Sequence, residues 1–343
     1  MSSLSWQKKF NVSICFVILA GCQTVKTRDE LRKSKSPVKA TVVVSAQAAP
    51  QAPSVEIPPE TPTTTTESVS EIEPQDQVPV LPPPPPVVPA IPKIGIILGA
   101  GGAKTYAHIA FLHEISRAKI PVFAIGGIEF AAPMAALYAN KEQANEVEWQ
   151  MFKLKEEDVA RKNLLGAQTS NVDIGSIREF LSGAFSRMRI DDFRIPFACP
   201  SVNLKKNQVY LMNRGGLEQV LSLCLAYPPY FKPYQESISG IREVTALANY
   251  LRSKGANHII LVNVLEAPNG IRSYVHDMNG TNNLLWNEIA ATYNRPAPGV
   301  DTLISLDTGG YGIMDFDKRR EIMNKGAEAS ARQIKNLMHK LGL

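Results

Sequence analysis

The chain has 343 residues and a net charge of +5, and 44% of its residues are hydrophobic. A chain of this length can bury one core, and its mild, dispersed charge excludes the basic footprint of a protein that binds nucleic acid. The five histidines and four cysteines are scattered without the spacing of a metal site. The sequence therefore predicts no metal and no other cofactor.

Residues 1–21 have the features of a secretory signal. Lys8 and Lys9 precede a short apolar stretch at about residues 12–20, too short to span a bilayer as a permanent helix. The stretch LAGC, ending at Cys22, resembles the lipobox of bacterial lipoproteins, in which the cysteine is acylated. An ordinary cleaved signal with an unmodified cysteine is the alternative. By the same resemblance, Gln23 points to the outer membrane, so we expect a lipid-anchored protein of the bacterial cell envelope.

Residues 22–92 are predicted to be a disordered linker behind the lipid anchor. They are rich in Pro, Thr, Ala and Gln, and they include TPTTTTES and a run of prolines from Pro82 to Pro86. Such a composition buries too little apolar surface to offset the entropy of ordering, and polyproline is stiff and extended. The segment is expected to be a spacer, with a ligand for a proline-binding module as the alternative.

Residues 93–343 alternate between two kinds of apolar pattern. Continuous apolar runs predict buried strands at residues 94–98, 122–125, 258–264 and 302–306. Amphipathic stretches predict helices at residues 106–118, 132–139, 142–154, 216–225, 243–253 and 316–341. Buried strands that alternate with helices favour a single α/β domain, in which helices cover both faces of a mainly parallel sheet.

The first predicted strand is followed by the glycine-rich stretch GAGGAKT, which begins at Gly99. A phosphate-binding P-loop would fit Lys104-Thr105 but requires glycines at positions 98 and 103, which are Leu and Ala. A dinucleotide fingerprint requires its third glycine where Lys104 stands. The pattern G-x-G-G-x-[KR]-G fits at six of seven positions, with Thr105 replacing the last glycine. This third pattern is the oxyanion loop of the patatin-like phospholipases.

A second motif, GGIEFAAP at residues 126–133, lies between a predicted strand and a predicted helix. It resembles the nucleophile elbow G-x-S-x-G, with Gly127 in the first position, Glu129 in the serine position and Ala131 in place of the second glycine. Residues 195–234 and the block that begins ISG at Ile238 resemble later segments of the same family. These ordered motifs predict the three-layer α/β fold of the patatin-like phospholipases.

The resemblance also implies a chemistry and its loss. The family uses a Ser–Asp dyad, and the two positions fall on Glu129 and Ile238, whereas the oxyanion amides fall on Gly101, Gly102 and Ala103. Because both reactive side chains are replaced by larger ones, we expect a narrowed cleft and a pseudoenzyme that binds a lipid, an acyl chain or a protein partner. Two alternatives remain, namely an active lipid acyl hydrolase with a rearranged site and an envelope scaffold.

Several single residues carry further expectations. Glu129 is expected to be exposed at a helix N-terminus, where the helix dipole favours a carboxylate. Ala131 predicts a relaxed elbow, because the glycine that it replaces permits tight packing under the turn. Lys104 is expected either to pair with Glu129 or to meet an anionic headgroup. Cys199 and Cys224 can form a disulfide or remain two buried thiols.

Overall fold

The computed structural model describes residues 92–159, 161–162, 168–169, 172–266, 273–275 and 280–342. The expected signal sequence, Cys22 and the proline-rich linker lie outside these residues. Within the described ranges, no helix combines the length and apolar character needed to cross a membrane.

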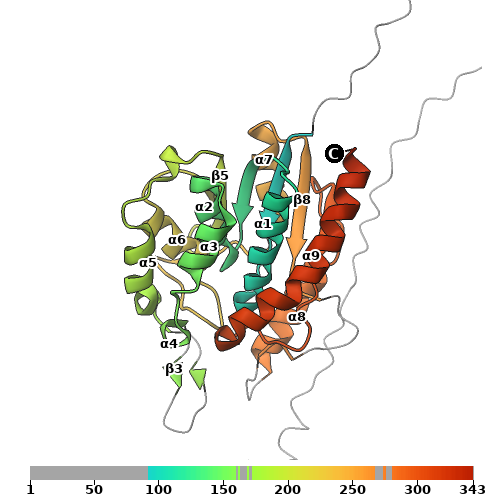
Figure 1. Ribbon diagram of the computed structural model, residues 1–343. Coiled ribbons are helices and arrows are strands. Elements are labelled where there is room, and N and C mark those ends of the chain that lie inside the picture. Colours follow the sequence, from blue (N-terminus) through green and yellow to red (C-terminus); the bar gives the residue numbers. More distant parts are fainter. Residues whose placement is uncertain are drawn as a thin grey trace, which may run out of the picture. The chain divides into compact units, whose positions relative to one another are not determined.

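The domain is built around a mainly parallel sheet, as the sequence predicts (Figure 1). Its path is β6-β5-β2-β1-β8-β9, and β7 pairs with β5 beside this path. The pairs β1–β2, β1–β8, β2–β5 and β8–β9 are parallel, whereas β6 and β7 run antiparallel to β5. The strands are β1 (Ile94–Leu98), β2 (Val122–Gly127), β5 (Phe197–Asn203), β6 (Gln208–Met212), β7 (Ser237–Ser239), β8 (His258–Asn263) and β9 (Thr302–Ser305). A separate pair is formed by β3 (Arg161–Lys162) and β4 (Gln168–Thr169).

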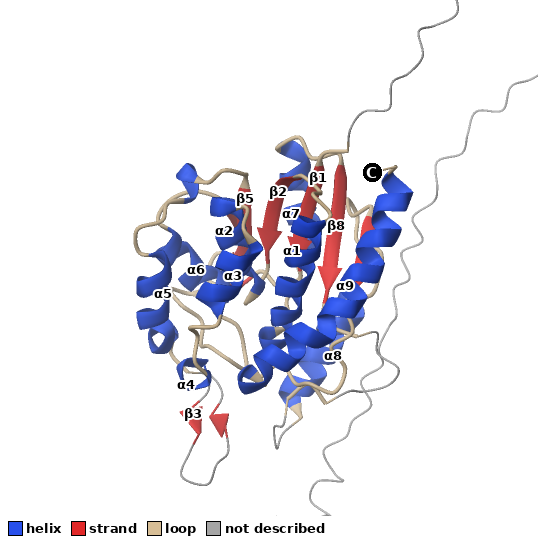
Figure 2. Ribbon diagram, in the orientation of Figure 1, coloured by secondary structure: helices blue, strands red, loops and turns tan. Residues whose placement is uncertain are grey.

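Helices cover the two faces of this sheet. In the view of Figure 2, α1, α2, α3 and α9 lie in front of the strands and α7 lies behind them. The helices are α1 (Ala107–Arg117), α2 (Ala131–Lys141), α3 (Ala144–Met151), α4 (Glu156–Val159), α5 (Arg178–Phe185), α6 (Leu217–Leu225), α7 (Val244–Ser253), α8 (Thr281–Tyr293) and α9 (Arg319–Leu341). All six predicted helices are present. The sequence pattern missed α4, α5 and α8; the first turn of α8, TNN, has the composition of a turn rather than of a helix.

The core lies between the sheet and its helices. All five residues of β1 are buried, which explains why this strand is a continuous apolar run rather than an alternating one. Glycines allow α7 to approach the sheet closely. A Cβ atom at Gly126 would lie 2.7 Å from a terminal carbon of Leu247, so a larger residue there would displace the helix.

A disulfide joins Cys199 of β5 to Cys224 of α6, with 6.1 Å between their Cα atoms. The sequence left open whether these cysteines pair, and the structure shows the pair. Both side chains are fully buried. The bond closes a loop of 25 residues, for which the chain-entropy model gives a stabilisation of about 3 kcal/mol. It fixes α6 against the strand with which β7 pairs.

Candidate active site

The turn between β2 and α2 keeps the geometry of a nucleophile elbow. Glu129 has a φ of 58°, in the left-handed region that non-glycine residues rarely adopt. Gly127 has no room for a side chain, because a Cβ atom there would lie 2.4 Å from the carbonyl oxygen of Ala131. The expectation that Ala131 relaxes the elbow is therefore wrong. The backbone of Ala131 packs under the turn, and its small side chain does not remove the strain.

The carboxylate of Glu129 lies inside the glycine loop. Its Oε2 accepts hydrogen bonds from the backbone amides of Gly101 at 3.1 Å and Gly102 at 2.9 Å. The residue is 0% exposed, so the expectation of a solvent-exposed helix-end carboxylate is wrong. Two converging amide donors hold the carboxylate more firmly than the helix dipole alone, because hydrogen bonds to an ionised acceptor are strong. The other oxygen, Oε1, is buried without a hydrogen-bond partner.

Burial changes the acidity of this carboxyl group. Loss of hydration raises the pKa of Glu129 to about 7, and hydrogen bonds from the amides of Gly102, Phe130 and Gly101 oppose the increase. Near neutral pH the group therefore exists in both its ionised and its protonated form. A carboxyl with such a pKa can exchange a proton at physiological pH, as a general base must.

The glycine loop presents two amides to Glu129 rather than three. The amide of Ala103, expected from the resemblance to bind the oxyanion, instead donates to the carbonyl of Ile313 at 2.7 Å. Gly102 has a φ of 54°, and a Cβ atom there would lie 1.7 Å from the hydroxyl of Tyr230. The loop therefore needs glycine at this position for both its backbone conformation and its close contact.

Aromatic side chains close the cleft around the elbow. The ring of Phe130 lies 5.0 Å from that of Tyr230 and 4.9 Å from that of Phe316, measured between centroids. All three are at most 1% exposed. The Tyr230 hydroxyl donates to the carbonyl of Ile313 at 3.1 Å, which fixes its ring against the glycine loop. The narrowed cleft expected from the sequence is therefore present around Glu129, and Phe130 contributes to it.

Lys104 has a different partner from either of the expected ones. Its Nζ lies 2.8 Å from Oε1 of Glu266 and donates to the carbonyl and hydroxyl oxygens of Thr308, each at 3.1 Å. The lysine is only 1% exposed. The predicted pairing with Glu129 is wrong, and so is contact with a headgroup in this conformation. Glu266 lies far along the chain from the glycine loop, and no sequence motif marks it as the partner.

The second dyad position, Ile238, lies in β7 opposite Val202 of β5 and is half-buried. It brings no charge to the site. Tyr293, which the sequence did not indicate, joins this region to the glycine loop. Its hydroxyl receives a hydrogen bond from the Ala100 amide at 3.4 Å and donates to the carbonyl of Ile241 at 2.8 Å. The aromatic residue thus positions the loop in the absence of an aspartate.

His108 of α1 holds the start of the glycine loop and has a structural role. Its Nε2 lies 2.8 Å from the carbonyl oxygen of Gly99. Burial lowers the pKa of His108 to about 4, so the ring is neutral at physiological pH and donates through Nε2. Because Nε2 is engaged by the Gly99 carbonyl oxygen, we assign the ring a role in holding the backbone of the loop rather than a role as a base.

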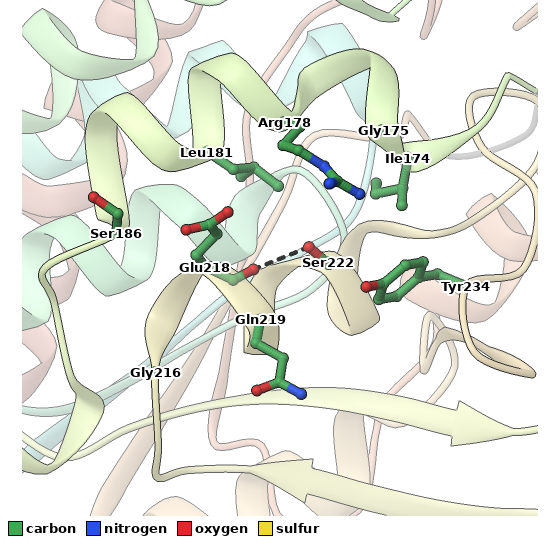
Figure 3. Close-up of a pocket in the computed structure, with 10 residues that line it drawn as sticks. All are labelled: Ile174, Gly175, Arg178, Leu181, Ser186, Gly216, Glu218, Gln219, Ser222 and Tyr234. Carbon is green, nitrogen blue, oxygen red and sulfur yellow. Dashed lines mark hydrogen bonds between the residues drawn. The ribbon is translucent and has the colours of Figure 1, made fainter.

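A pocket of about 390 Å³ lies elsewhere, between α5 and α6 (Figure 3). Arg178, Glu218 and Tyr234 are among its lining residues. In Figure 3 the Arg178 side chain extends from α5 over the side of α6 that carries Ser222. No residue of the elbow or of the glycine loop lines this pocket. The elbow and the glycine loop are therefore distinct from this open pocket, and Lys104 of the loop lines a second pocket of about 340 Å³.

A strained elbow, set beside two glycine amides at the ends of adjacent parallel strands, defines the site class of α/β acyl hydrolases. Residues 96–237 match the family model described as patatin-like phospholipase. Residues 96–237 thus resemble the patatin-like phospholipases, and the predicted patatin-like α/β fold with a mainly parallel sheet is confirmed.

Curated relatives resemble the chain at low identity. "Neuropathy target esterase sws" of Drosophila melanogaster is 25% identical over 199 residues, which cover 54% of this chain and 14% of the relative. "Lysophospholipase NTE1" of Pyricularia oryzae is 23% identical over 218 residues, which cover 59% of this chain and 14% of the relative. The chain therefore spans about one seventh of the length of these relatives.

Solved structures align with the chain at still lower sequence identity. VipD from Legionella pneumophila aligns with a TM-score of 0.40 and 11% identity, covering 71% of this chain and 67% of that one. ExoU of Pseudomonas aeruginosa, in complex with SpcU, aligns with a TM-score of 0.38 and 10% identity, and the alignment covers 71% of this chain and 52% of that one.

These comparisons contradict the prediction that the chain is a pseudoenzyme and not an enzyme. The matched model describes phospholipases, and the curated relatives are named as an esterase and as lysophospholipases. The prediction relied on the replacement of two side chains, at positions 129 and 238. Such a replacement does not by itself show that activity is lost.

Proposed function

We propose that the domain hydrolyses an acyl ester of a lipid, with Glu129 as the general base and water as the nucleophile. The observation that carries this proposal is the pair of amides, of Gly101 and Gly102, that converge on one carboxyl oxygen of Glu129. An oxyanion formed from an ester carbonyl needs the same two donors at the same distances. The names of the relatives support lysophospholipids or related esters as the substrate class.

The reaction begins with an exchange at the glycine loop. The ester carbonyl oxygen replaces Oε2 of Glu129 at the two amides, and the Glu129 side chain turns away while its backbone stays fixed at the elbow. Its carboxylate then removes a proton from a water molecule, whose oxygen attacks the carbonyl carbon. The carbonyl π electrons move onto oxygen, and the amides of Gly101 and Gly102 stabilise the resulting charge.

The second half of the reaction returns the proton. The bond from the tetrahedral carbon to the alcohol oxygen breaks, and protonated Glu129 donates its proton to the leaving alkoxide. The products are a fatty acid and an alcohol, and Glu129 is again ionised. Ile238 supplies no charge to orient the water, so general-base catalysis rests on Glu129 alone. A carboxyl with a pKa of about 7 is suited to both the removal and the return of the proton.

The test is release of fatty acid from lysophosphatidylcholine micelles by the full chain. We expect measurable hydrolysis whose rate increases with pH through about 7, because the base must be ionised. Glu129→Gln should reduce the rate by roughly 10² or more, because glutamine keeps the shape and cannot take a proton. The Glu328→Gln variant, at an exposed position of α9, is the matched control and should keep the full rate. Absence of hydrolysis by the natural chain, or equal rates for it and Glu129→Gln, would contradict the proposal.

We also propose that Cys22 is acylated and holds the domain at the outer membrane, where its substrate would be a membrane lipid. The LAGC motif supports the modification, and a buried disulfide accords with an oxidising compartment such as the periplasm. In a bacterial host fed radiolabelled palmitate, the natural chain should incorporate label and sediment with outer membranes. The Cys22→Ser variant should do neither. Labelling of both chains, or of neither, would overturn this proposal.

A further inference from the structure

Large apolar side chains are exposed at several places on the domain. Trp149 of α3 is 65% exposed, Leu284 of α8 is 59% exposed, and Leu204, directly after β5, is 50% exposed. A single exposed apolar side chain is common on any protein, but a group at one edge marks an interaction surface. We therefore ask whether these three side chains lie at the same edge of the domain as the candidate active site.

Trp149 lies at the edge of the sheet that carries the glycine loop. The loop leads into a short 3₁₀ turn, η1 (Gly102–Tyr106). The Tyr106 hydroxyl donates to the carbonyl of Met151, the last residue of α3, at 2.8 Å. Because Trp149 precedes Met151 by only two residues, it lies near this same edge. Figure 1 shows the end of α3 on the side toward which the arrowhead of β8 points.

Leu204 and Leu284 lie at this edge as well. Leu204 follows the last residue of β5, which runs parallel to β2 and so ends at the edge where the elbow begins. Leu284 belongs to α8, whose Trp286 indole donates to the carbonyl of Pro228 at 3.2 Å. The last residue of α8, Tyr293, receives the hydrogen bond from the Ala100 amide of the glycine loop. The helix is thus held at the carboxyl end of the sheet.

Cationic side chains accompany two of these apolar ones. The Nζ of Lys153 lies 4.9 Å from the centre of the Trp149 ring. Lys205 and Lys206, both exposed, directly follow Leu204. Tryptophan beside lysine is the combination that occupies the boundary between headgroups and acyl chains, where the ring is partly apolar and the ammonium meets phosphate.

We propose that Trp149, Leu204 and Leu284 define a lipid-contact edge, which docks on the surface of an anionic bilayer. This inference rests on the proposed function, since an ester drawn from a membrane must enter at the edge that carries the elbow and the glycine loop. The apolar side chains enter the acyl boundary, and the neighbouring lysines meet the phosphates. The dependence on anionic lipid follows from the positive charge of Lys153 and Lys206, since Lys205 is paired with Glu236 at 3.5 Å.

Tryptophan fluorescence provides a direct test, because the chain has three tryptophans. In the full chain carrying Trp6→Phe, together with Cys22→Ser to remove the proposed lipid anchor, the remaining two are exposed Trp149 and fully buried Trp286. Vesicles of phosphatidylcholine and phosphatidylglycerol with brominated acyl chains should quench the emission of Trp149. The Trp149→Phe variant should still bind these vesicles and show no quenching, because Trp286 is shielded.

Two apolar-to-acidic variants refine the test. Leu204→Asp and Leu284→Asp should each reduce quenching and weaken vesicle binding roughly tenfold, since each removes a leucine from the acyl boundary. Leu303→Asp, at an exposed position within edge strand β9, is the matched control and should leave both unchanged.

Unquenched Trp149 on vesicles that bind the chain would overturn the lipid-contact edge, as would binding that is equal on anionic and neutral vesicles. Capture of a protein partner by this edge, lost in Leu204→Asp with no quenching by lipid, would also overturn it. Fluorescence reports contact and not ester cleavage. A chain that is quenched but releases no fatty acid therefore contradicts only the proposed hydrolase activity.

Discussion

Glu129→Gln should abolish a decrease in folding stability that the natural chain undergoes as the pH rises from about 4.5 to about 7. The folded-state pKa of Glu129, about 7, lies above its ordinary value of 4.5, so the folded protein binds this proton more tightly than the unfolded chain does. The stabilisation of the fold by this proton is fully present below pH 4.5 and is lost as the pH rises through 7. Its size is on the order of 3 kcal/mol.

His108 acts in the opposite direction over nearly the same pH range. Its folded-state pKa of about 4 lies below the ordinary 6.5, so its contribution is present above pH 6.5 and is lost as the pH falls through 4. The two effects oppose each other in the natural chain between pH 4.5 and 6.5. The informative quantity is therefore the difference in unfolding free energy between the natural chain and Glu129→Gln, measured by urea titration at pH 5 and pH 8. A difference that is the same at both pH values would show that Glu129 is not buried between the two amides.

Gly102→Ala should destabilise the fold by about 3 kcal/mol or more. A φ of 54° costs an alanine about 1–2 kcal/mol. In addition, its Cβ atom would lie 2.3 Å from the carbonyl oxygen of Ile313 and 1.7 Å from the Tyr230 hydroxyl. The contact with the backbone of Ile313 cannot be relieved by a change of rotamer, and overpacking of this kind typically adds about 1–3 kcal/mol. Urea-induced unfolding of the full chain, followed by circular dichroism, measures the loss.

Gly183→Ala is the matched control for this substitution. Gly183 lies within α5 and has no positive φ, and a Cβ atom there would have no neighbour within 4 Å. Alanine at this position should increase stability by about 0.5–1 kcal/mol, because it restricts the unfolded chain and favours the helix. If both variants lost similar stability, the conformation ascribed to the glycine loop would be wrong.

The fold could be predicted because its signals are local. The apolar run at 94–98 and the stretch GAGGAKT each specify a strand and a turn without reference to distant residues, and both occur as expected. The site was predicted less well, because side-chain partners depend on contacts between distant segments. Glu266 meets Lys104 across 162 residues, and Tyr293 meets Ala100 across 193 residues. No local pattern encodes such pairs.

The orientation of Glu129 illustrates the same limit. Its position at the start of a helix suggested exposure, because a helix dipole favours a solvated carboxylate. The inward direction is set by amides 27 and 28 residues earlier in the chain and by the aromatic rings that cover the elbow. Whether Cys199 and Cys224 pair could not be predicted for a related reason, because the spacing of two cysteines in the sequence does not fix the distance between a strand and a helix.

The carboxylate between the amides of Gly101 and Gly102 carries the same functional group as a free fatty acid. The resting domain therefore resembles an enzyme that has not yet released its product, with residue 129 as a tethered copy of that product. In the proposed reaction, an incoming ester must displace the Glu129 carboxyl group, which is permanently tethered beside the two amides. The apparent affinity for the ester would then depend as much on the free energy of displacing Glu129 as on any contact with the lipid.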